Sequence, residues 1–449
     1  MGVLLLRRTN RILPVYSADI SGVCSALYEL GGMTVMHDAS GCNSTYTTHD
    51  EPRWYSMDSM VYISALSELE AVMGDDGKLV RDIVDAARNL HPKFICIGGT
   101  PIPMMMGTDF KGIARMIEAQ TNIPAFGIST NGMHSYVQGA GEALRWIAKR
   151  FCPLREELAD AGIWEDEGAE KPGTMGRRRL RVNILGATPL DFSLTGNVAR
   201  MKDFLKAQGM EIVSCWAMES SLEELRLAGT ADVNLVVSGV GLPAARQLRE
   251  MYKTPYVTGI PVGRKTALRL ADLMRRGAES GGNQSLFATS HDAGRDGDAS
   301  AAFGAETAAH GAETAAPGAE TAALGAETAD LGLDGLPENL AGERILLIGE
   351  QIMAGSLRCS LREDFGAKDV TVLCPTEGEK SLAEEGDLLD WDEDEVISRI
   401  KESTVVIADP IYRLVCSEDS GVVFVNFPHE ACSGRMYHDS MKPFVCGGN

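Results

Sequence analysis

The fold is decided by a strand–helix alternation that opens at Leu180-Arg-Val-Asn-Ile-Leu-Gly186, an apolar run that ends at a glycine. A helical pattern follows over residues 197–208, and short apolar runs over residues 211–215 and 233–238 have the pattern of buried strands. Strands that alternate with helices of about ten to fifteen residues are typical of a parallel sheet covered by helices. This part of the chain therefore predicts an α/β unit.

The same alternation continues on both sides of this stretch. Strand patterns also lie at residues 32–37, 60–65, 94–98, 124–128, 344–349, 369–373, 405–408 and 422–427. We therefore expect an α/β fold of three Rossmann-like parallel-sheet units, formed by residues 1–177, 178–276 and 343–449. Ligands of such sheets bind beyond the carboxyl ends of the strands, so the site is expected there.

The interval 277–342 has a different composition. It contains a tandem heptad with the shared sequence Gly-Ala-Glu-Thr-Ala, and the copies start at Phe303, His310, Pro317 and Leu324. Each copy holds a glycine and no continuous apolar seam runs through the repeat, so a coiled coil is not expected. With eleven acidic residues and one arginine, the interval is predicted to be a disordered, acidic, low-complexity linker between two folded units.

The composition excludes several classes of partner. The chain of 449 residues has 63 acidic and 42 basic residues and a formal charge of −21. It lacks the basic balance that favours binding to nucleic acid or to anionic lipid, so neither is expected. No run of about 18 uncharged apolar residues predicts a membrane-spanning helix. The order of the first residues is not that of a secretory signal, and ten cysteines in such a chain favour reduced thiols, so a cytoplasmic location is expected.

Nucleotide-binding motifs are incomplete. Residues 259–266 resemble a phosphate loop, but three residues in place of four separate the glycines, and Arg264 lies between Gly263 and Lys265. Neither Gly186 nor Gly349 begins a dinucleotide fingerprint. A bound nucleotide is therefore not expected.

Two cysteines flank a strand–turn unit near the start of the chain. The sequence runs Ser21-Gly-Val-Cys24, continues through a short apolar helix and a strand, and ends in His37-Asp-Ala-Ser-Gly41-Cys42. Gly41 beside a thiolate lets backbone N–H groups approach the sulfur. Two such cysteines from each of two symmetry-related chains would make the four-thiolate set of a [4Fe–4S] cluster. Two buried structural cysteines are the alternative.

These residues resemble the nitrogenase component 1 superfamily of oxidoreductases. Its pattern is a first cysteine, a helix with a glycine turn, and a strand into His-Gly-x-x-Gly-Cys, which residues 37–42 match as His-Asp-Ala-Ser-Gly-Cys. The resemblance continues through residues 98–109, where the family has a Thr-Cys-Pro segment, and through residues 123–136. It extends over nearly the whole chain outside the predicted linker.

The resemblance implies that Cys24 and Cys42 are metal ligands of an iron–sulfur cluster, with Gly41 and Thr100 beside it. Thr100 stands where the family has its third cluster cysteine, and Cys96 is expected in the core, so a single [4Fe–4S] cluster shared between two chains is expected. Ser238 stands where the family has the cysteine that ligates the molybdenum cofactor. Serine oxygen is a poor ligand for that iron, so a molybdenum-cofactor dinitrogen reductase is not expected.

The resemblance also implies a function and partners. We expect an oxidoreductase subunit that forms a homodimer, or a heterodimer with a second component 1-like subunit. A separate ATP-dependent iron–sulfur reductase would supply electrons, which pass through the cluster to a substrate that is hard to reduce. Two alternatives stay open, namely a non-catalytic scaffold for metallocofactor assembly and an α/β ligand-binding protein with structural cysteines.

Two further groups of residues are candidates for the site. His429, Cys432 and His438 follow the last predicted strand and are candidate catalytic residues, as proton donors or metal ligands, with ordinary loop residues and a core cysteine as the alternative. His49 and Arg53 lie just after Cys42. They are expected to close over the cluster or to meet the partner chain, or else to lie in a solvated turn.

Overall fold

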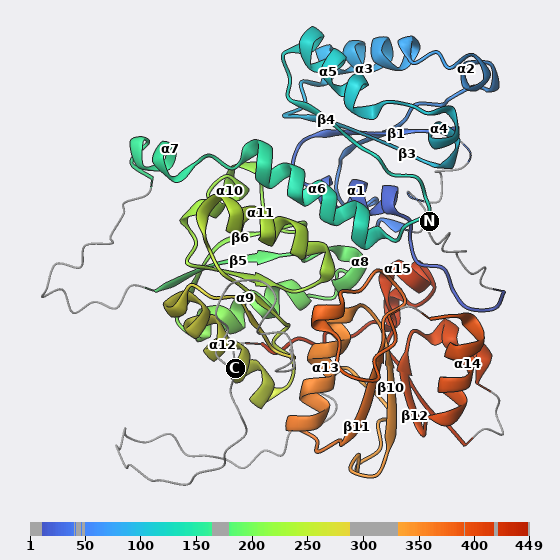
Figure 1. Cartoon of the computed structure of the whole chain (residues 1–449), viewed down its shortest axis with the longest axis vertical. Helices are drawn as coiled ribbons and strands as arrows, with labels where there is room; N and C mark the ends of the chain where they lie inside the picture. Colours follow the sequence, from blue (N-terminus) through green and yellow to red (C-terminus); the bar gives the residue numbers. More distant parts are fainter. Residues whose placement is uncertain are drawn as a thin grey trace, which may run out of the picture.

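The structure is a computed structural model in which three parallel sheets form three blocks (Figure 1). It describes residues 11–39, 41, 46, 50–163, 179–287, 331–389, 391–416 and 421–447. Every pair of neighbouring strands in these sheets is parallel. The predicted α/β fold of three parallel-sheet units is therefore confirmed.

The first sheet has the strand order β2-β1-β3-β4. Its strands are β1 (Met33–His37), β2 (Met60–Ile63), β3 (Ile95–Gly99) and β4 (Ala125–Ile128). The helices of this block are α1 (Asp19–Leu27), α2 (Glu68–Met73), α3 (Gly77–Leu90), α4 (Pro101–Met106), α5 (Phe110–Thr121), α6 (Tyr136–Phe151) and α7 (Arg155–Asp160). Helices α3 and α5 cover one face of the sheet and α1 and α6 the other (Figure 1). Both faces are thus buried, which is why the strands are apolar throughout.

Helices α1 and α6 cross at an unusually short distance because glycines lie at the crossing. A Cβ atom on Gly139 of α6 would lie 1.8 Å from the carbonyl oxygen of Asp19, and one on Gly22 of α1 would lie 2.2 Å from that of Tyr136. No side chain fits in either place. The crossing therefore fixes the start of α6 against the start of α1.

The second sheet has the order β6-β5-β7-β8-β9. Its strands are β5 (Leu180–Leu185), β6 (Met210–Cys215), β7 (Val233–Val236), β8 (Tyr256–Thr258) and β9 (Gln284–Ser285). Its helices are α8 (Pro189–Phe192), α9 (Asn197–Ala207), α10 (Leu222–Leu225), α11 (Leu242–Tyr252) and α12 (Arg264–Ser280). Helix α11 also packs against α6, so the first and second blocks share one apolar core.

The third sheet has the order β11-β10-β12-β13. Its strands are β10 (Arg344–Ile348), β11 (Asp369–Leu373), β12 (Val405–Ala408) and β13 (Val423–Asn426). Helices α13 (Gln351–Glu363) and α14 (Glu393–Glu402) cover its two faces, and the short α15 (Glu430–Ser433) follows β13 (Figure 1). Helix α13 packs against α12 of the second block.

The predicted linker is too long at both ends. Helix α12 continues to Ser280, and β9 adds a strand to the second sheet. Phe287 on one side and Leu331 on the other are buried in the shared core. These apolar residues form folded structure because the neighbouring sheet offers them a surface, which the acidic average of the interval conceals. Its central part, residues 288–330, lies outside the described residues.

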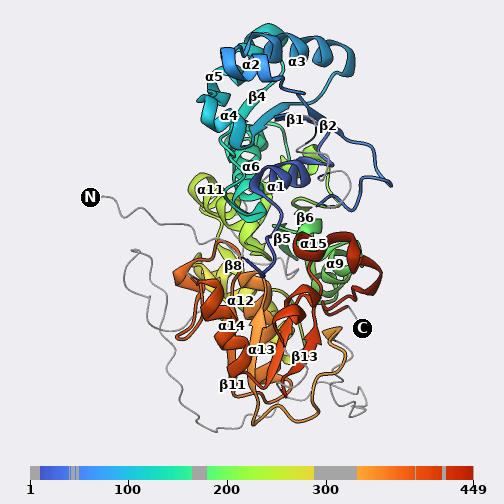
Figure 2. The same ribbon diagram turned by 90° about the vertical axis from the view of Figure 1, so that its right-hand side faces the viewer.

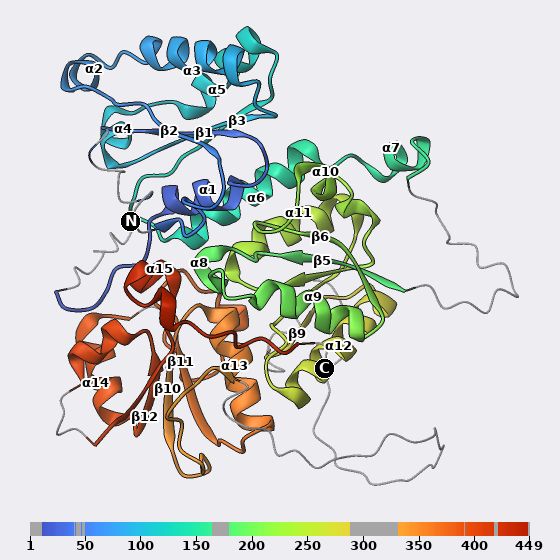
Figure 3. The same cartoon turned by 180° about the vertical axis from the view of Figure 1, so that it is seen from behind.

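The three blocks meet around α6, α8 and α15. Figure 2 and Figure 3 show α15 of the third block beside α8 of the second, with α1 and α6 of the first block above them. The N-terminal segment crosses the same region, where Ser17 N–H donates to the Ala431 carbonyl and the Ser17 carbonyl accepts from Tyr136 N–H. None of the described helices is long and apolar enough to span a membrane.

Candidate functional site

Cys24 lies in the middle of α1 and is completely buried. Its thiol is free and belongs to a small apolar cluster with Ile20, Tyr28, Met36, Tyr46 and Val61. Burial raises the pKa of the Cys24 thiol well above its usual value, and Cys96, Glu51 and Asp50 raise it further. In the absence of a metal the group is therefore a protonated thiol.

The other residues predicted around the cluster are placed only in part. Cys42 lies outside the described residues, as does His49. Gly41 is exposed, and a Cβ atom there would meet nothing within 4 Å. Thr100 follows β3 and is 5% exposed, and its hydroxyl oxygen has no hydrogen-bond partner within the described part of the chain. Cys96 points into the main core, as predicted.

The donor set can be compared with what an iron–sulfur cluster requires. A [4Fe–4S] cluster is held by four thiolates. Among the described residues, no group of three or more His, Cys, Asp or Glu side chains is arranged to hold a metal ion. Cys24 fits as one soft sulfur ligand of a larger set, and the other ligands would have to come from Cys42 and from a second chain.

Arg53 is not where either interpretation expected it. The residue is 2% exposed, so it neither meets a partner chain nor lies in a solvated turn, and both predictions are wrong. The physical reason is a buried partner, because Glu51 accepts hydrogen bonds from its Nε and Nη2 at 2.7 and 2.9 Å.

A second group of polar residues gathers at the carboxyl ends of strands in the second and third sheets. Asp191 follows β5, Ser238 follows β7, Glu350 follows β10, and His429 follows β13. Tyr136 joins them from the start of α6. All five side chains are buried, and we call these five residues the junction cluster. Its place is the one that parallel sheets use for ligands.

Asp191 is the centre of the junction cluster. Its Oδ1 accepts a hydrogen bond of 2.5 Å from the Tyr136 hydroxyl, and its Oδ2 accepts one of 2.7 Å from the Ser238 hydroxyl. His429 Nε2 lies 3.4 Å from Oδ1. Burial, followed by the charge of Asp191, raises the pKa of Tyr136 well above its usual value. Tyr136 therefore keeps its proton and acts as a donor.

Glu350 holds the start of α13. Its carboxylate accepts from the N–H groups of Ile352 and Met353 at 3.0 Å, and from Gly239 of the second block at 2.9 Å. Burial is the main cause, and Asp191 the second, of a pKa raised to about 7. A carboxyl group with this pKa exchanges a proton at neutral pH, which Brønsted behaviour favours for an acid–base group.

His429 and Glu430 carry buried polar atoms that lack partners. Neither ring nitrogen of His429 has a hydrogen bond within the described residues, although the ring is 3% exposed and lies between the rings of Tyr16 and Tyr136. The same is true of Glu430 Oε1. Unpaired buried polar atoms are rare in proteins, and they mark a place where a ligand or water completes the structure.

The other two C-terminal candidates lie near this group. His438 Nδ1 is 3.1 Å from Glu430 Oε2 and 3.4 Å from the Ser193 hydroxyl. Cys432 is half-buried, and burial followed by Asp409 raises the pKa of its thiol. Sequence reasoning missed Asp191, Glu350 and Tyr136. A systematic inspection of the residue after each strand would have found Glu350, which directly follows Gly349.

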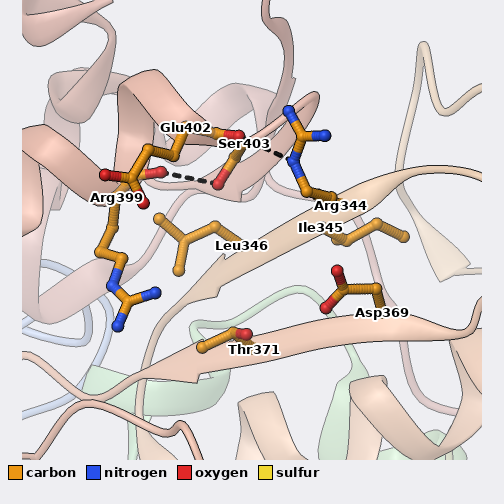
Figure 4. Close-up of a pocket in the computed structure, with 8 residues that line it drawn as sticks. All are labelled: Arg344, Ile345, Leu346, Asp369, Thr371, Arg399, Glu402 and Ser403. Carbon is orange, nitrogen blue, oxygen red and sulfur yellow. Dashed lines mark hydrogen bonds between the residues drawn. The ribbon is translucent and has the colours of Figure 1, made fainter.

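The largest described pocket lies elsewhere. It has a volume of about 400 Å³ and is formed at the amino ends of β10 and β11 (Figure 4). Arg344 Nε donates to the Glu402 carbonyl at 2.9 Å and Ser403 Oγ to the Arg399 carbonyl at 2.7 Å, so its polar groups are already engaged with each other. The amino ends of parallel strands are not their usual ligand-binding edge.

Comparison with known proteins decides the family. The family described as nitrogenase component 1 type oxidoreductase matches residues 22–408, which include Cys24, Asp191, Ser238 and Glu350. The chain belongs to this family. The resemblance predicted from the cysteine motif is therefore confirmed.

Relatives of this nitrogenase component 1 type chain are distant. The nitrogenase iron-molybdenum cofactor biosynthesis protein NifE of Clostridium pasteurianum is 23% identical over 264 residues, which cover 56% of this chain and 53% of that protein. The NifE protein of Methanosarcina barkeri is 24% identical over 43% of this chain and 39% of its own length. One of the subunits of the light-independent protochlorophyllide reductase of Prosthecochloris aestuarii is 35% identical over 27% of this chain and 23% of its own length. The chain thus spans about half or less of the curated relatives it matches.

A solved structure supports the fold over the whole length. The structure titled "Nitrogenase Cp1 at pH 6.5" matches with a TM-score of 0.61 and 16% identity, over 99% of this chain and 92% of that one. At this identity the likeness shows the nitrogenase component 1 fold alone.

Proposed function

We propose that this chain is the iron–sulfur subunit of an oxidoreductase that reduces a substrate at the junction cluster. The observation that carries the proposal is the convergence of Asp191, Glu350 and His429 from three strand ends onto Tyr136, at the start of the helix that packs on the Cys24 helix. Cys24 is about 8 Å along the α1 axis from the Asp19 end that meets α6, from the helical rise per residue. A place for an electron carrier and a place for proton donors are therefore neighbours.

Each group has a role in this proposal. Cys24, with Cys42 and thiolates of a second chain, holds a [4Fe–4S] cluster, which supplies one-electron transfer when bound. Tyr136 and His429 donate protons to the reduced substrate, because every electron added to an unsaturated bond must be balanced by a proton. Glu350 exchanges protons at neutral pH. Asp191 orients Tyr136 through the 2.5 Å hydrogen bond.

The partners follow from the family. We propose a dimer of this chain with itself or with a second component 1-like chain, and an ATP-dependent iron–sulfur reductase as the source of electrons. The substrate is an oxidised compound that is hard to reduce. Ser238 Oγ is engaged with Asp191 and offers no thiolate, so molybdenum-cofactor chemistry at that residue is not part of the proposal.

Anaerobic purification of the full chain tests this function. We expect iron and acid-labile sulfide in the wild type, and their loss in both Cys24→Ala and Cys42→Ala. Addition of a reductase with ATP should then bleach the visible absorption of the cluster. If iron and sulfide are absent, or neither variant changes the spectrum, the cysteines are structural and a ligand-binding role takes precedence.

The relatives favour one other candidate. The C. pasteurianum and M. barkeri proteins are named for biosynthesis of the iron-molybdenum cofactor, so a scaffold on which a metallocofactor is assembled is the second proposal. The two functions differ in turnover. A scaffold releases a metal cofactor to an acceptor protein and consumes no small substrate, whereas an oxidoreductase turns over repeatedly with reductase and ATP.

A further inference from the structure

The side chain of Arg53 is buried in a network beside Cys24. Its Nε and Nη2 donate to the two carboxylate oxygens of Glu51 at 2.7 and 2.9 Å, and its Nη1 donates to Glu29 at 2.7 Å. The remaining donors reach the carbonyl oxygens of Ser25 at 2.8 Å and Ala217 at 3.1 Å. The five N–H groups of the guanidinium therefore meet five acceptors.

These acceptors come from three separate parts of the chain. Ser25 is the neighbour of Cys24 in α1, and the guanidinium also lies 4.6 Å from the centre of the Tyr28 ring, just beyond that helix. Glu51 belongs to the segment that leads into β2, and Ala217 follows β6 of the second sheet. One planar group thus fixes the Cys24 turn of α1 relative to the first and the second block.

The network also surrounds Cys24 from a second side. Glu51 Oε2 accepts from the Ser25 hydroxyl at 2.7 Å and from the Tyr46 hydroxyl at 3.3 Å. Tyr46 packs in the same apolar cluster as Cys24. Removal of the ion pair would therefore release both the residue beside Cys24 and an aromatic ring that covers it.

The backbone of the second block is strained where the network holds it. Ala217 has φ of +91° and Glu219 has φ of +57°, which residues with a side chain rarely adopt. Arg53 Nη1 donates to the Ala217 carbonyl, and Glu219 N–H donates to Glu29 at 2.7 Å. Such conformations persist only where the surroundings fix them, and they cluster at functional sites.

Stability alone is a poor reason for this arrangement. A buried ion pair loses its hydration, and apolar residues of the same volume often stabilise a fold as well or better. What the charged fork provides is direction, since a guanidinium accepts only one geometry of acceptors.

We propose that Arg53 is a positioning residue for Cys24 as a metal ligand, acting through the Ser25 carbonyl and the Glu51 carboxylate. The inference rests on the proposed function, because it requires Cys24 to bind metal. Arg53 itself does not touch the metal. Its role is that of an outer-shell partner, whose loss typically lowers metal affinity by about 10- to 100-fold.

Arg53→Lys is the decisive variant because it keeps the charge and loses the fork. Arg358→Lys is the matched control. Arg358 is 1% exposed and pairs with Asp387 and Glu384 at 2.6 and 3.2 Å, but it lies on α13 of the third block. The full chains would be loaded anaerobically with ferrous iron and sulfide. Iron affinity would be measured by chelator competition, the cluster by electron paramagnetic resonance after reduction, and the unloaded chains by denaturant unfolding.

We expect R53K to weaken iron binding by about 10-fold or more and to change the resonance line shape. R358K should lower the unfolding midpoint comparably and leave both metal readouts at wild-type values. A purely structural Arg53 would make the two variants alike, and that result overturns the inference. If R53K does not fold, Glu29→Gln removes one acceptor from the same fork, and wild-type metal readouts in that variant overturn it as well.

Cys24→Ala separates this inference from the proposed function. If C24A binds iron as the wild type does, or the wild type binds none, then Cys24 is no ligand and both proposals fail. If C24A loses iron while R53K keeps the wild-type affinity and spectrum, only the role of Arg53 is wrong.

Discussion

Tyr136 and Asp191 are joined by a 2.5 Å hydrogen bond from the hydroxyl group to the carboxylate, and this bond ties the start of α6 to the end of a strand in the second sheet. The same carboxylate receives the Ser238 hydroxyl at 2.7 Å and faces His429 Nε2 at 3.4 Å. Residues of all three blocks therefore depend on one buried acid. The arrangement of the blocks and the chemistry of the junction cluster cannot change independently.

Tyr136→Phe tests this dependence. The variant keeps the ring and removes a hydrogen bond to a carboxylate, so the free energy of unfolding should fall by about 1.5–3 kcal/mol. Tyr252→Phe is the matched control, because that hydroxyl donates to the Pro153 carbonyl at the same distance of 2.5 Å, and a bond to a neutral group contributes about 0.5–1.5 kcal/mol. Denaturant titration measures both, and equal losses would contradict a charged acceptor at Asp191.

Glu350→Gln is expected to change how stability depends on pH. The pKa of Glu350 is about 7 in the folded chain and has its ordinary value of 4.5 when the chain unfolds. The folded state thus binds the proton more tightly, so the contribution of Glu350 to stability is complete below pH 4.5 and is lost as pH rises through 7. Glutamine cannot titrate but still accepts from the N–H groups at the start of α13.

The measurement for Glu350 is the free energy of unfolding at several values between pH 5 and pH 8. Wild type should lose stability relative to E350Q over this interval. A difference between the two proteins that stays constant with pH would show that Glu350 is ionised throughout, and it would remove Glu350 from the proton-exchanging role.

Gly139→Ala is expected to separate α1 from α6. The new methyl group would lie 1.8 Å from the Asp19 carbonyl oxygen, and a clash with backbone cannot be relieved by a side-chain movement. Overpacking typically lowers stability by about 1–3 kcal/mol, and this backbone clash should reach the upper end of that range. Gly342→Ala, where a Cβ meets nothing within 4 Å, should change stability by less than about 0.5 kcal/mol. Thermal unfolding distinguishes the two.

The fold was largely predictable because its signal is local. Apolar runs bounded by glycine or polar residues predicted the strands of all three sheets, and β11 and β12 begin and end at the predicted residues. Helices were less exact where caps and core contacts decide the ends. The helix predicted at residues 82–90 begins at Gly77, because Leu79 and Val80 also reach the core. The helix predicted at 221–228 ends at Leu225.

The site was predictable only where a motif marks it. Cys24 was found from its spacing to Cys42, and His429 and His438 from their place after the last strand. Asp191 and Tyr136 have no such signal, since their meeting depends on how two blocks dock, and docking leaves no periodicity in the sequence. Arg53 was misplaced for the same reason, because three of its acceptors, Glu29, Ser25 and Ala217, are distant in the sequence.

Phe287 shows most clearly where composition fails as a guide. The residue lies within the interval predicted as a linker, yet it is 4% exposed and belongs to the shared core, with its ring 3.1 Å from the place of a Cβ on Gly355 in α13. Phe287→Ala should therefore lower the free energy of unfolding by about 3–5 kcal/mol, because a large cavity would remain between α13 and the second sheet. Leu414→Ala, at a side chain 75% exposed, is the control and should cost less than about 0.5 kcal/mol. Denaturant unfolding of the full chain decides the matter: a loss at Phe287 no larger than that at Leu414 would restore the original boundary of the linker at residue 277.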